Sequence, residues 1–517
     1  MGLYPGTVKD PHTAFTFAVL DDFLLENKEC KTAALNYYSK LKWVTSNAFP
    51  GTIPDRYREL MRVSRQWCQL KYRKWHGFSH DALRPVEKGG LAIFCPACPQ
   101  PGLNLPFDWQ ADPVQWKFKH GFVMDGNFSA EHMKMKHPEE DVALSNGQAF
   151  MVGQEDYKAH LAVAMESHQV RVWLHVLLPP LTPKPTSRST CHEHRAVNQA
   201  NVDRANLDAT GIGATACTRH GFFVPHTVVD FQKGERQMNM DYSLSNALLT
   251  LTGITLVLVM YDIMCQYGIH VRKRFRHSAY LRMPFELKID QGIGLFHVHG
   301  HQDCCFQWFS PNFIVGAGMV DGEVIETLGM TRAHRQEVLD DHMNDSNWKK
   351  TTRMVLTLMT KWKRVLLGFP RSKESFEALS ASTDEEVLEA WQKEYDDAME
   401  ARQNDPKIMD TFDVQLRKAP GKDLTQLRLA GEESAKGLEK GTAGWLSTGL
   451  KIQEAQLKLA NDIRKAGQNP SVAEDLKTLE RHQHLEVSIL TFQRRSEKFM
   501  GRLEDVPAME DCDDGAL

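Results

Sequence analysis

The sequence predicts an α/β core with helical regions before and after it. Residues 118–125 (FKHGFVMD) form a short, aromatic-rich run that ends in an acid, and residues 255–261 (TLVLVMY) are continuously apolar. The second run is rich in β-branched residues, as expected for a strand buried on both faces, and it leads directly into Asp262. In the flanking regions, apolar residues recur at three- and four-residue spacing, which predicts amphipathic helices.

A chain of 517 residues is too long for one hydrophobic core. We expect a helical region at residues 1–106, ending in a loop with a Cys-x2-Cys pair, and an α/β core at residues 107–330. The proline-bearing stretch at 177–190 marks the entry to a surface insertion in that core, and this insertion is expected to carry zinc. Residues 331–517 are expected to be helical, with an acidic tail (EDCDDGAL) whose composition is typical of disorder.

Three more elements are expected in the core. Residues 221–230 (GFFVPHTVVD) are typical of a strand, and Pro225 puts that strand near an edge or a bulge. Residues 242–251 have helical spacing, and Gly253 suits the end of the helix. Residues 294–299 (GLFHVH) are typical of a further short strand.

Helices are also expected outside the core. Their apolar residues recur at helical spacing, and they lie at residues 13–25, 56–75, 332–366, 384–402 and 445–498. Breaks are expected around Pro370, Pro406 and Pro420.

The composition is ordinary for a soluble globular protein, with 42% hydrophobic and 25% charged residues. No apolar run reaches the roughly 18 residues of a membrane helix, and the N-terminus lacks the pattern of a secretory signal. The net charge is -4, but residues 62–73 and 272–276 are locally basic, which suits either a solvated helix face or phosphate contacts. The ten cysteines suggest free thiols or zinc in an intracellular protein.

Acids follow both of the predicted hydrophobic strands. Asp125 and Asp262 end these strands, and Glu323 and Glu326 follow a glycine-rich loop at a spacing that shares one helix face. Phosphodiester cleavage and strand transfer use such acids to hold two divalent ions beside the phosphate, and Mg²⁺ needs only a few carboxylates. The alternative is that each acid forms a turn or caps a helix.

Three Cys-x2-Cys or Cys-x2-His pairs have spacing that suits zinc. The pairs are Cys95/Cys98, Cys191/His194 and Cys217/His220. We favour a tetrahedral site built from the second and third pairs, and pairings with the first remain open. A further cluster (HVHGHQDCC) holds His297, His299, His301, Cys304 and Cys305. On a strand the three histidines would face one side, where they could lie near the acids and contact DNA, join Cys265 in a structural metal site, or be hydrogen-bonded core residues.

Long stretches of the sequence resemble the Kyakuja-Dileera-Zisupton (KDZ) family of transposases, best known from fungi. The stretches include CPACPQPGLNLP, MDGNFSAEHMKM, TGIGATACTRHGFFVPHTVVDFQKGERQMNMDYSLSNALL, MYDIMCQYGIHVRKR, GLFHVHGHQDCC, FSPNFIVGAGMVDGEVIETL and AHRQEVLDDHMNDSNWKK. The resemblance is densest from residue 95 to residue 350.

The resemblance implies an RNase H-like catalytic domain with an Asp-Asp-Glu set that binds Mg²⁺ or Mn²⁺. By position, Asp125 falls in the DGNF word, Asp262 in the YD-x-MCQ word, and Glu323 in the DGE-x2-E word, with Glu326 as the alternative third acid. The family also implies structural zinc, a nuclear location and double-stranded DNA partners at transposon ends and target. A homo-oligomer is left open.

Two departures from the family pattern bear on activity. The N-terminal cysteine cluster (CxC type) of the family is expected upstream of the start of this chain. The segment ETLGMTRAHRQE is shorter than the family pattern behind the third acid, which suggests a truncated or inactive copy. The alternatives to an active transposase are a non-catalytic DNA- or protein-binding remnant, and a helical interaction protein that uses residues 332–498.

Overall fold

The structure is a computed structural model, and the chain divides into two compact units, residues 1–413 and 414–517. It describes residues 2–78, 84–134, 142–164, 191, 206–318, 320, 335–413, 428–429, 431–432, 441–466 and 471–500. Within these residues, no helix is both long enough and apolar enough to cross a membrane.

The first unit begins with a small helical assembly that has its own core. Its elements are β1 (Leu3–Pro5), β2 (Ala14–Thr16), α1 (Phe17–Glu29), α2 (Ala34–Thr45) and α3 (Tyr57–Trp75). The side chain of Thr16 begins α1 by accepting a hydrogen bond from the backbone of Val19 at 3.2 Å. Leu20, Tyr37 and Trp67 bring the three helices together in one buried cluster. The helix expected at residues 56–75 is confirmed as α3. The helix expected at residues 13–25 is confirmed only from Phe17 onward, as α1, because Ala14–Thr16 form the strand β2.

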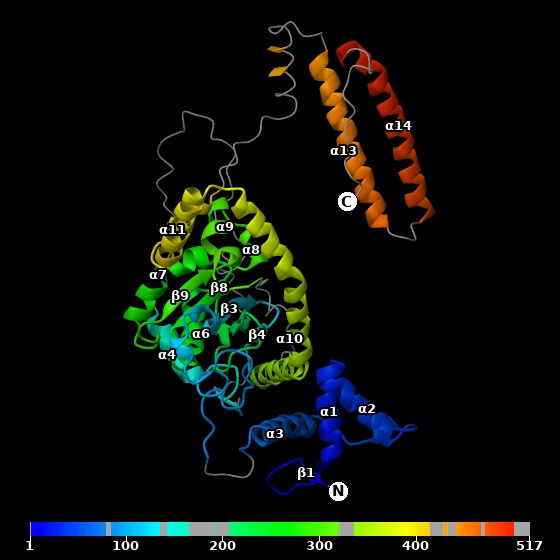
Figure 1. The fold of residues 1–517 in the computed structure, drawn as a ribbon. Coiled ribbons are helices and arrows are strands. Elements are labelled where there is room, and N and C mark those ends of the chain that lie inside the picture. Colours follow the sequence, from blue (N-terminus) through cyan, green and yellow to red (C-terminus); the bar gives the residue numbers. More distant parts are fainter. Residues whose placement is uncertain are drawn as a thin grey trace, which may run out of the picture. The chain divides into compact units, whose positions relative to one another are not determined.

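A five-stranded mixed sheet forms the centre of the first unit (Figure 1). In spatial order its strands are β7 (Val229–Phe231), β6 (Gly211–Cys217), β3 (His120–Asn127), β8 (Leu256–Tyr261) and β9 (Lys288–Gly292). β7, β6 and β3 are antiparallel neighbours, whereas β3, β8 and β9 run parallel to one another. The expected strand at 255–261 is β8, which is flanked by strands on both sides. The strand expected at residues 221–230 is wrong for most of its length, because only Val229–Phe231 forms a strand, at the edge of the sheet, and Pro225 lies in the turn region before it.

Each face of the sheet is covered by apolar side chains. α6 (Gln237–Leu249) and α7 (Met264–His277) cover the face that carries Phe122, Met124 and Tyr261. The other face carries Val123 and Met260, which pack with Ile314, Ala317 and Val320. Further along this second face, the β6 residues Ile212 and Ala214 pack with Leu339 and Met343 of α10. Successive side chains of β3 therefore pack alternately into two separate apolar layers, one on each face of the sheet.

Shorter elements complete the first unit. They are β4 (His132–Met133), β5 (Leu207–Ala209), α4 (Gln154–Val163), α8 (Leu295–Val298), α9 (Asp303–Phe309) and the 3₁₀ turns Pro50–Thr52, Trp109–Ala111, Gln115–Phe118, Pro311–Phe313 and Pro406–Phe412. The strand expected at residues 294–299 is wrong, because this stretch forms the single helical turn α8. Val298 is the buried residue of α8. The alternating pattern of residues 294–299 is too short to distinguish a strand from one turn of helix.

Two helices end the first unit. α10 (Arg335–Ala381) runs for 47 residues and α11 (Glu385–Ala401) follows it. The break expected at Pro370 is wrong, because α10 continues through this residue. The residues around Pro370 are exposed, so water can satisfy the carbonyl group that loses its helical partner.

The second unit contains a helical hairpin. α13 (Thr442–Ala466) and α14 (Val472–Met500) are joined by aromatic contacts, and the rings of Trp445 and Phe492 stack with 4.6 Å between their centroids. The helical character expected for residues 445–498 is confirmed within the part of this unit that the structure describes. The acidic tail lies outside the described residues.

Candidate acidic site and metal centres

Asp125 and Asp262 lie at the same end of the central sheet. β3 and β8 are parallel neighbours, and their last paired residues are Met124 and Tyr261. Each aspartate follows its member of that pair directly. Since neighbouring strands are about 4.8 Å apart, the two acids start from adjacent backbone positions at the carboxyl ends of the strands. The structure therefore brings together two of the acids that the sequence proposed as ligands.

His297 faces the second of these acids. Its Nε2 atom lies 3.4 Å from Oδ1 of Asp262, and the two side chains are 25% and 28% exposed. Asp125 accepts a hydrogen bond from the backbone N–H of Gly126 at 2.7 Å. Asp125 is half-buried, so both aspartates are partly open to solvent, as access by a ligand requires. The hypothesis that one of the three histidines lies near the acids is confirmed for His297.

Glu235 is a further acidic residue at this end of the sheet, and it was not predicted from the sequence. It stands two residues before α6, and its Oε1 atom accepts a hydrogen bond from the Tyr261 hydroxyl at 2.6 Å. A Cβ atom added at Gly126 would lie 2.7 Å from the other oxygen of Glu235, so the carboxylate occupies space that only glycine leaves free. Burial, followed by the charge of Asp262, raises the pKa of Glu235 to about 7. The signals in the sequence were Gly126 and the acid just before a helix, and neither is specific.

Glu323 and Glu326 lie outside the described residues. Val320 is the nearest described residue before them, and it packs with Val123 and Met260 on the face of the sheet to which Asp125 also belongs by alternation. The backbone N–H of Leu295 donates to the carbonyl of Val320 at 3.4 Å, which ties this segment to α8.

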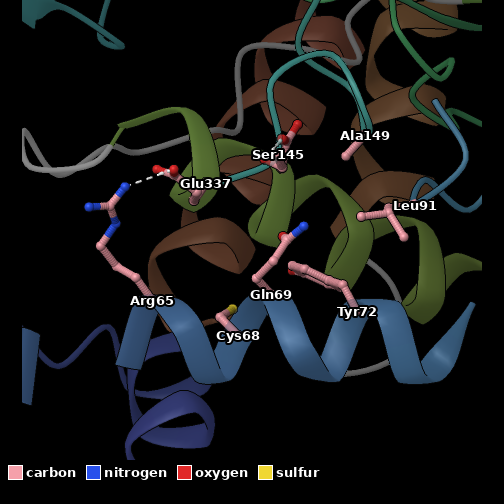
Figure 2. Close-up of a pocket in the computed structure, with 9 residues that line it drawn as sticks. Arg65, Cys68, Gln69, Tyr72, Leu91, Ser145, Ala149 and Glu337 are labelled. Atoms are coloured by element: carbon pink, nitrogen blue, oxygen red, sulfur yellow. Dashed lines mark hydrogen bonds and ion pairs between the residues drawn. The ribbon is translucent and has the colours of Figure 1, made fainter. Parts of the chain in front are cut away.

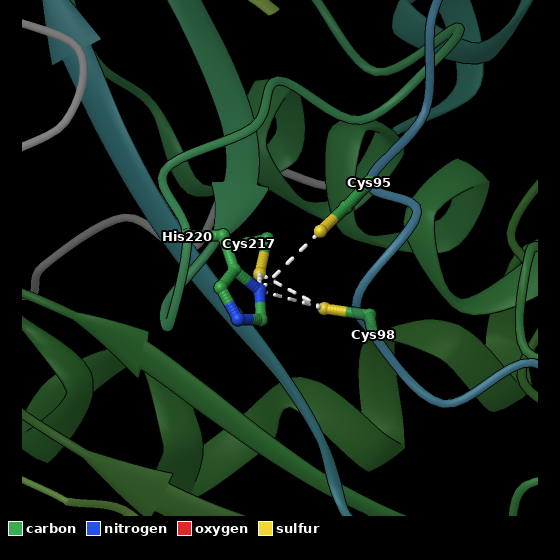
Figure 3. Close-up of side chains that lie close together, drawn as sticks. All are labelled: Cys95, Cys98, Cys217 and His220. Carbon is green, nitrogen blue, oxygen red and sulfur yellow. Dashed lines mark hydrogen bonds between the residues drawn. The ribbon is translucent and has the colours of Figure 1, made fainter. Parts of the chain in front are cut away.

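A first group of metal-ligand side chains lies at the opposite end of β3 (Figure 3). Its members are Cys95, Cys98, Cys217 and His220, whose candidate ligand atoms all lie within 4.8 Å of one another. The Nδ1 atom of His220 is 3.3, 3.6 and 3.5 Å from the sulfur atoms of Cys95, Cys98 and Cys217, respectively. Ligand atoms on a zinc tetrahedron are about 3.6–3.8 Å apart, so this group could hold a metal such as zinc.

Hydrogen bonds among the three thiols of this group shift their pKa values in opposite directions. The hydrogen bond with Cys217 raises the pKa of Cys95 to about 12, and the same partner raises the pKa of Cys98. Hydrogen bonds from Cys95 and Cys98 lower the pKa of Cys217. The arrangement fits a divalent cation, which would stabilise all three thiolates at once.

A second group consists of Cys191, Cys265, His301 and Cys305, again within 4.8 Å of one another. The Nδ1 atom of His301 is 3.4 Å from the sulfur of Cys265, and the sulfur atoms of Cys191 and Cys305 are 3.7 Å apart. These separations also match a tetrahedral metal such as zinc. The hypothesis that a histidine of the HVHGHQDCC stretch joins Cys265 is confirmed for His301.

The favoured pairing of Cys191/His194 with Cys217/His220 is corrected by the structure. Cys191 and Cys217 fall in different groups, and His194 lies outside the described residues. The open alternative, in which Cys95 and Cys98 join Cys217 and His220, is the arrangement found. Sequence spacing could not decide between the two pairings because each group combines residues from segments that are distant in the sequence.

Two neighbours of the second group are not among its ligand candidates. Cys304 is half-exposed, and its sulfur lies 3.8 Å from Oε1 of Gln302. His299 stacks on Phe306, with 5.7 Å between the ring centroids. Because α8 is helical, His297, His299 and His301 do not share one side as they would on a strand.

A small cavity between α3 and α10 has a different character (Figure 2). It is lined by Cys68 and by Arg65 and Glu337, whose Nη2 and Oε1 atoms form an ion pair at 2.9 Å. Burial raises the pKa of Cys68, which makes this thiol a poor nucleophile. The ion pair also shows that Arg65, in the basic stretch 62–73, binds α10 rather than facing solvent. The cavity is therefore part of the packing interface between α3 and α10.

A comparison with protein families identifies the family of the central part of this chain. Residues 118–347 match the family model described as Kyakuja-Dileera-Zisupton transposase. The domain is of the KDZ family, and it contains all five strands of the central sheet together with both acids. No curated protein and no solved structure matches the chain.

The N-terminal comparison corrects one expectation. Residues 1–49 match the family model described as CxC2 like cysteine cluster associated with KDZ transposases, so the expectation that the chain begins downstream of such a module is wrong. This stretch contains a single cysteine, Cys30, which is exposed. Among the described residues it belongs to neither metal-ligand group. The matched segment is folded mainly as α1 and α2.

Proposed function

We propose that this protein is a DNA transposase that cleaves DNA and joins strands at the acids at the carboxyl ends of β3 and β8. The observation that carries the proposal is the register of these parallel strands, which places Asp125 and Asp262 side by side. The KDZ domain match supports DNA as the substrate.

The strand arrangement supports an RNase H-like core. Such a core is a five-stranded mixed sheet in which three antiparallel strands are followed in the chain by two strands parallel to the first. Here β3, β6 and β7 are the antiparallel strands, and β8 and β9 follow, with β3 and β8 adjacent at the centre. In chain order, the first strand, β3, contains Asp125, and the fourth strand, β8, leads directly into Asp262.

Asp125, Asp262 and a third acid would hold Mg²⁺ or Mn²⁺. Two such ions supply activation of the attacking oxygen and stabilisation of the leaving one in an in-line displacement at phosphorus. We favour Glu323 as the third acid, with Glu326 as the alternative. Support comes from Val320, which packs beside Val123 and Met260, since three further residues can span up to roughly 10 Å from there.

His297 is suited to orient Asp262 or to contact the DNA phosphate from its own side of the acid. The partly exposed positions of both side chains leave an approach for the DNA backbone.

Exposed basic residues on α7 support DNA as the partner. Arg272, Lys273 and Arg276 are exposed on the helix that begins directly after Asp262. Arg274 is not available for this role because it forms two hydrogen bonds with Asp241, at 2.6 and 2.9 Å. We expect the three exposed side chains to neutralise phosphates near the acidic site, and we expect the protein to act in the nucleus.

The test is nicking of DNA that carries the element's terminal repeats, by the purified full chain with Mg²⁺ or Mn²⁺. Asp262→Asn should reduce nicking to the level of a reaction without protein, because the second strand-end ligand loses its charge. The matched control is Asp108→Asn, which alters an exposed aspartate before a 3₁₀ turn and should nick at the wild-type rate. Full activity of Asp262→Asn would eliminate the proposal. DNA binding without metal-dependent nicking in the wild type would favour the non-catalytic remnant instead.

A further inference from the structure

The second Cys/His group joins three segments that are distant in the sequence. Cys265 lies in the first turn of α7, and the second segment supplies both His301, which follows α8, and Cys305 of α9. Cys191 is the third, and its sulfur lies 3.7 Å from that of Cys305. Three thiols and one imidazole nitrogen within 4.8 Å are a complete ligand set for tetrahedral zinc.

Two of these segments also carry the strand-end site. Asp262 stands three residues before Cys265, and His297 stands four residues before His301. Asp262 and His297 are 3.4 Å apart, and the ligands Cys265 and His301, a few residues further along the same two segments, are also close together. A metal that binds Cys265 and His301 would therefore restrict the distance between Asp262 and His297.

Among the described residues, a small number of local contacts hold the segment between β9 and α9: the backbone N–H of Ile293 donates to Phe309 at 2.8 Å, that of Leu295 donates to Val320 at 3.4 Å, and His299 stacks on Phe306. α8 is a single turn of four residues, and Val298 is its one buried side chain. Phe296 is 71% exposed, so its ring adds little packing. A short helix with so few buried groups gains most of its order from tertiary restraints. A metal bound by the ligand group would add a restraint at His301, four residues after His297.

We propose that Cys191, Cys265, His301 and Cys305 bind a zinc ion that positions Asp262 and His297 at the proposed active site. The inference rests on the proposed function for the role of those two residues. Binding of Zn²⁺ replaces the protons of three thiols, so three protons are released, no electron is transferred, and the His301 ring binds through the nitrogen near Cys265. The four ligands are positioning residues.

The first Cys/His group provides an internal comparison. Cys217 pairs with Phe122 across β6 and β3, three residues before Asp125, which is about 10 Å along the strand. Zinc at Cys95, Cys98, Cys217 and His220 would stabilise the opposite end of the sheet, so its loss should leave the Asp262 and His297 contact in place.

The first measurement is the zinc content of the purified full chain by inductively coupled plasma mass spectrometry. We expect two zinc ions per chain in the wild type and one in Cys305→Ser. The matched control is Cys304→Ser, the adjacent thiol outside the ligand group, which should retain two. Cys191→Ser is a second variant and should also lose one ion. Retention of full zinc content by Cys305→Ser and Cys191→Ser would overturn the metal site.

The second measurement separates positioning from general stabilisation. Binding of Mn²⁺, followed by electron paramagnetic resonance, should weaken by on the order of 10-fold in Cys305→Ser, and Cys98→Ser and Cys304→Ser should keep wild-type affinity. Hydrogen exchange should increase in peptides covering α7 and α8 in Cys305→Ser alone. Unchanged Mn²⁺ affinity after loss of the zinc would refute the positioning role.

The two proposals fail in distinguishable ways. A wild-type chain that contains two zinc ions and binds no Mn²⁺ would reject the proposed function together with the positioning role, and the zinc site would stand. A chain that binds Mn²⁺ and contains only the zinc of the first group would reject the inference and leave the proposed function intact.

Discussion

Asp340 gives the sharpest test of how burial sets the pH dependence of stability. Its carboxylate is 1% exposed on α10, where Oδ1 accepts backbone hydrogen bonds from Phe150 and Met151, both at 2.9 Å, and Ser145 contacts Oδ2 at 3.1 Å. Burial raises the pKa of Asp340 from 3.8 to about 7. The perturbation is Asp340→Asn, which keeps the acceptor for both backbone groups and removes the ionisation.

The raised pKa of Asp340 determines the direction and the size of the change in the free energy of unfolding with pH. The folded state holds the proton more tightly than the unfolded state, so the stabilisation is fully present below pH 3.8 and is lost as the pH rises toward 7. A shift of about three pKa units corresponds to about 4 kcal/mol in total, and about 2.5 kcal/mol of it falls between pH 5 and pH 8. Asp340→Asn should remove this loss, so its stability should fall less than that of the wild type over that range.

Urea unfolding followed by circular dichroism at pH 5, 6, 7 and 8 measures the difference. The control is Asp397→Asn, an exposed position on α11, which should follow the wild-type curve. Equal pH dependence in the wild type and in Asp340→Asn would refute the reasoning, since it would mean that the carboxylate ionises in the folded state at no extra cost.

Three further predictions concern other parts of the chain. Lys119→Met should cost about 3–5 kcal/mol in urea unfolding, because it leaves Asp290 without its buried ion-pair partner; a loss below 1 kcal/mol would contradict this. Gly126→Ala should cost about 1–3 kcal/mol, because the new methyl group meets the carboxylate of Glu235, and Glu235→Ala in the same chain should recover part of the loss; additive effects would exclude the contact. Trp445→Ala should lower the melting temperature of the hairpin of α13 and α14, and an unchanged melt would show that the stacked rings do not hold it.

The sheet explains why two acids separated by more than 130 residues can act together. Parallel neighbours present their carboxyl ends at the same edge, so a residue that ends one strand lies beside the residue that ends the next. The pairing of Met124 with Tyr261 converts a separation in sequence into one strand spacing. The KDZ match covers this whole arrangement, from β3 to the first turns of α10.

Elements whose signals are local could be predicted from the amino-acid sequence. The apolar run of β8, the helical spacing of α3 and α6, and the aspartates at the ends of two strands all follow from patterns within about 20 residues. Motif words in the same stretches indicated the family, and the match to residues 118–347 confirms it. The third acid at Glu323 or Glu326 stays a prediction.

Contacts between residues that are distant in the sequence became visible only in the folded chain. The tertiary structure placed Cys191 with Cys305 rather than with Cys217, set His297 against Asp262, and brought Glu235 under the end of β8. It also folded residues 295–298 as a helical turn where alternation had predicted a strand. The physical reason is the same in each case: short spacing patterns fix local backbone geometry, whereas the partners of a thiol, an imidazole or a carboxylate are chosen by the packing of whole strands and helices.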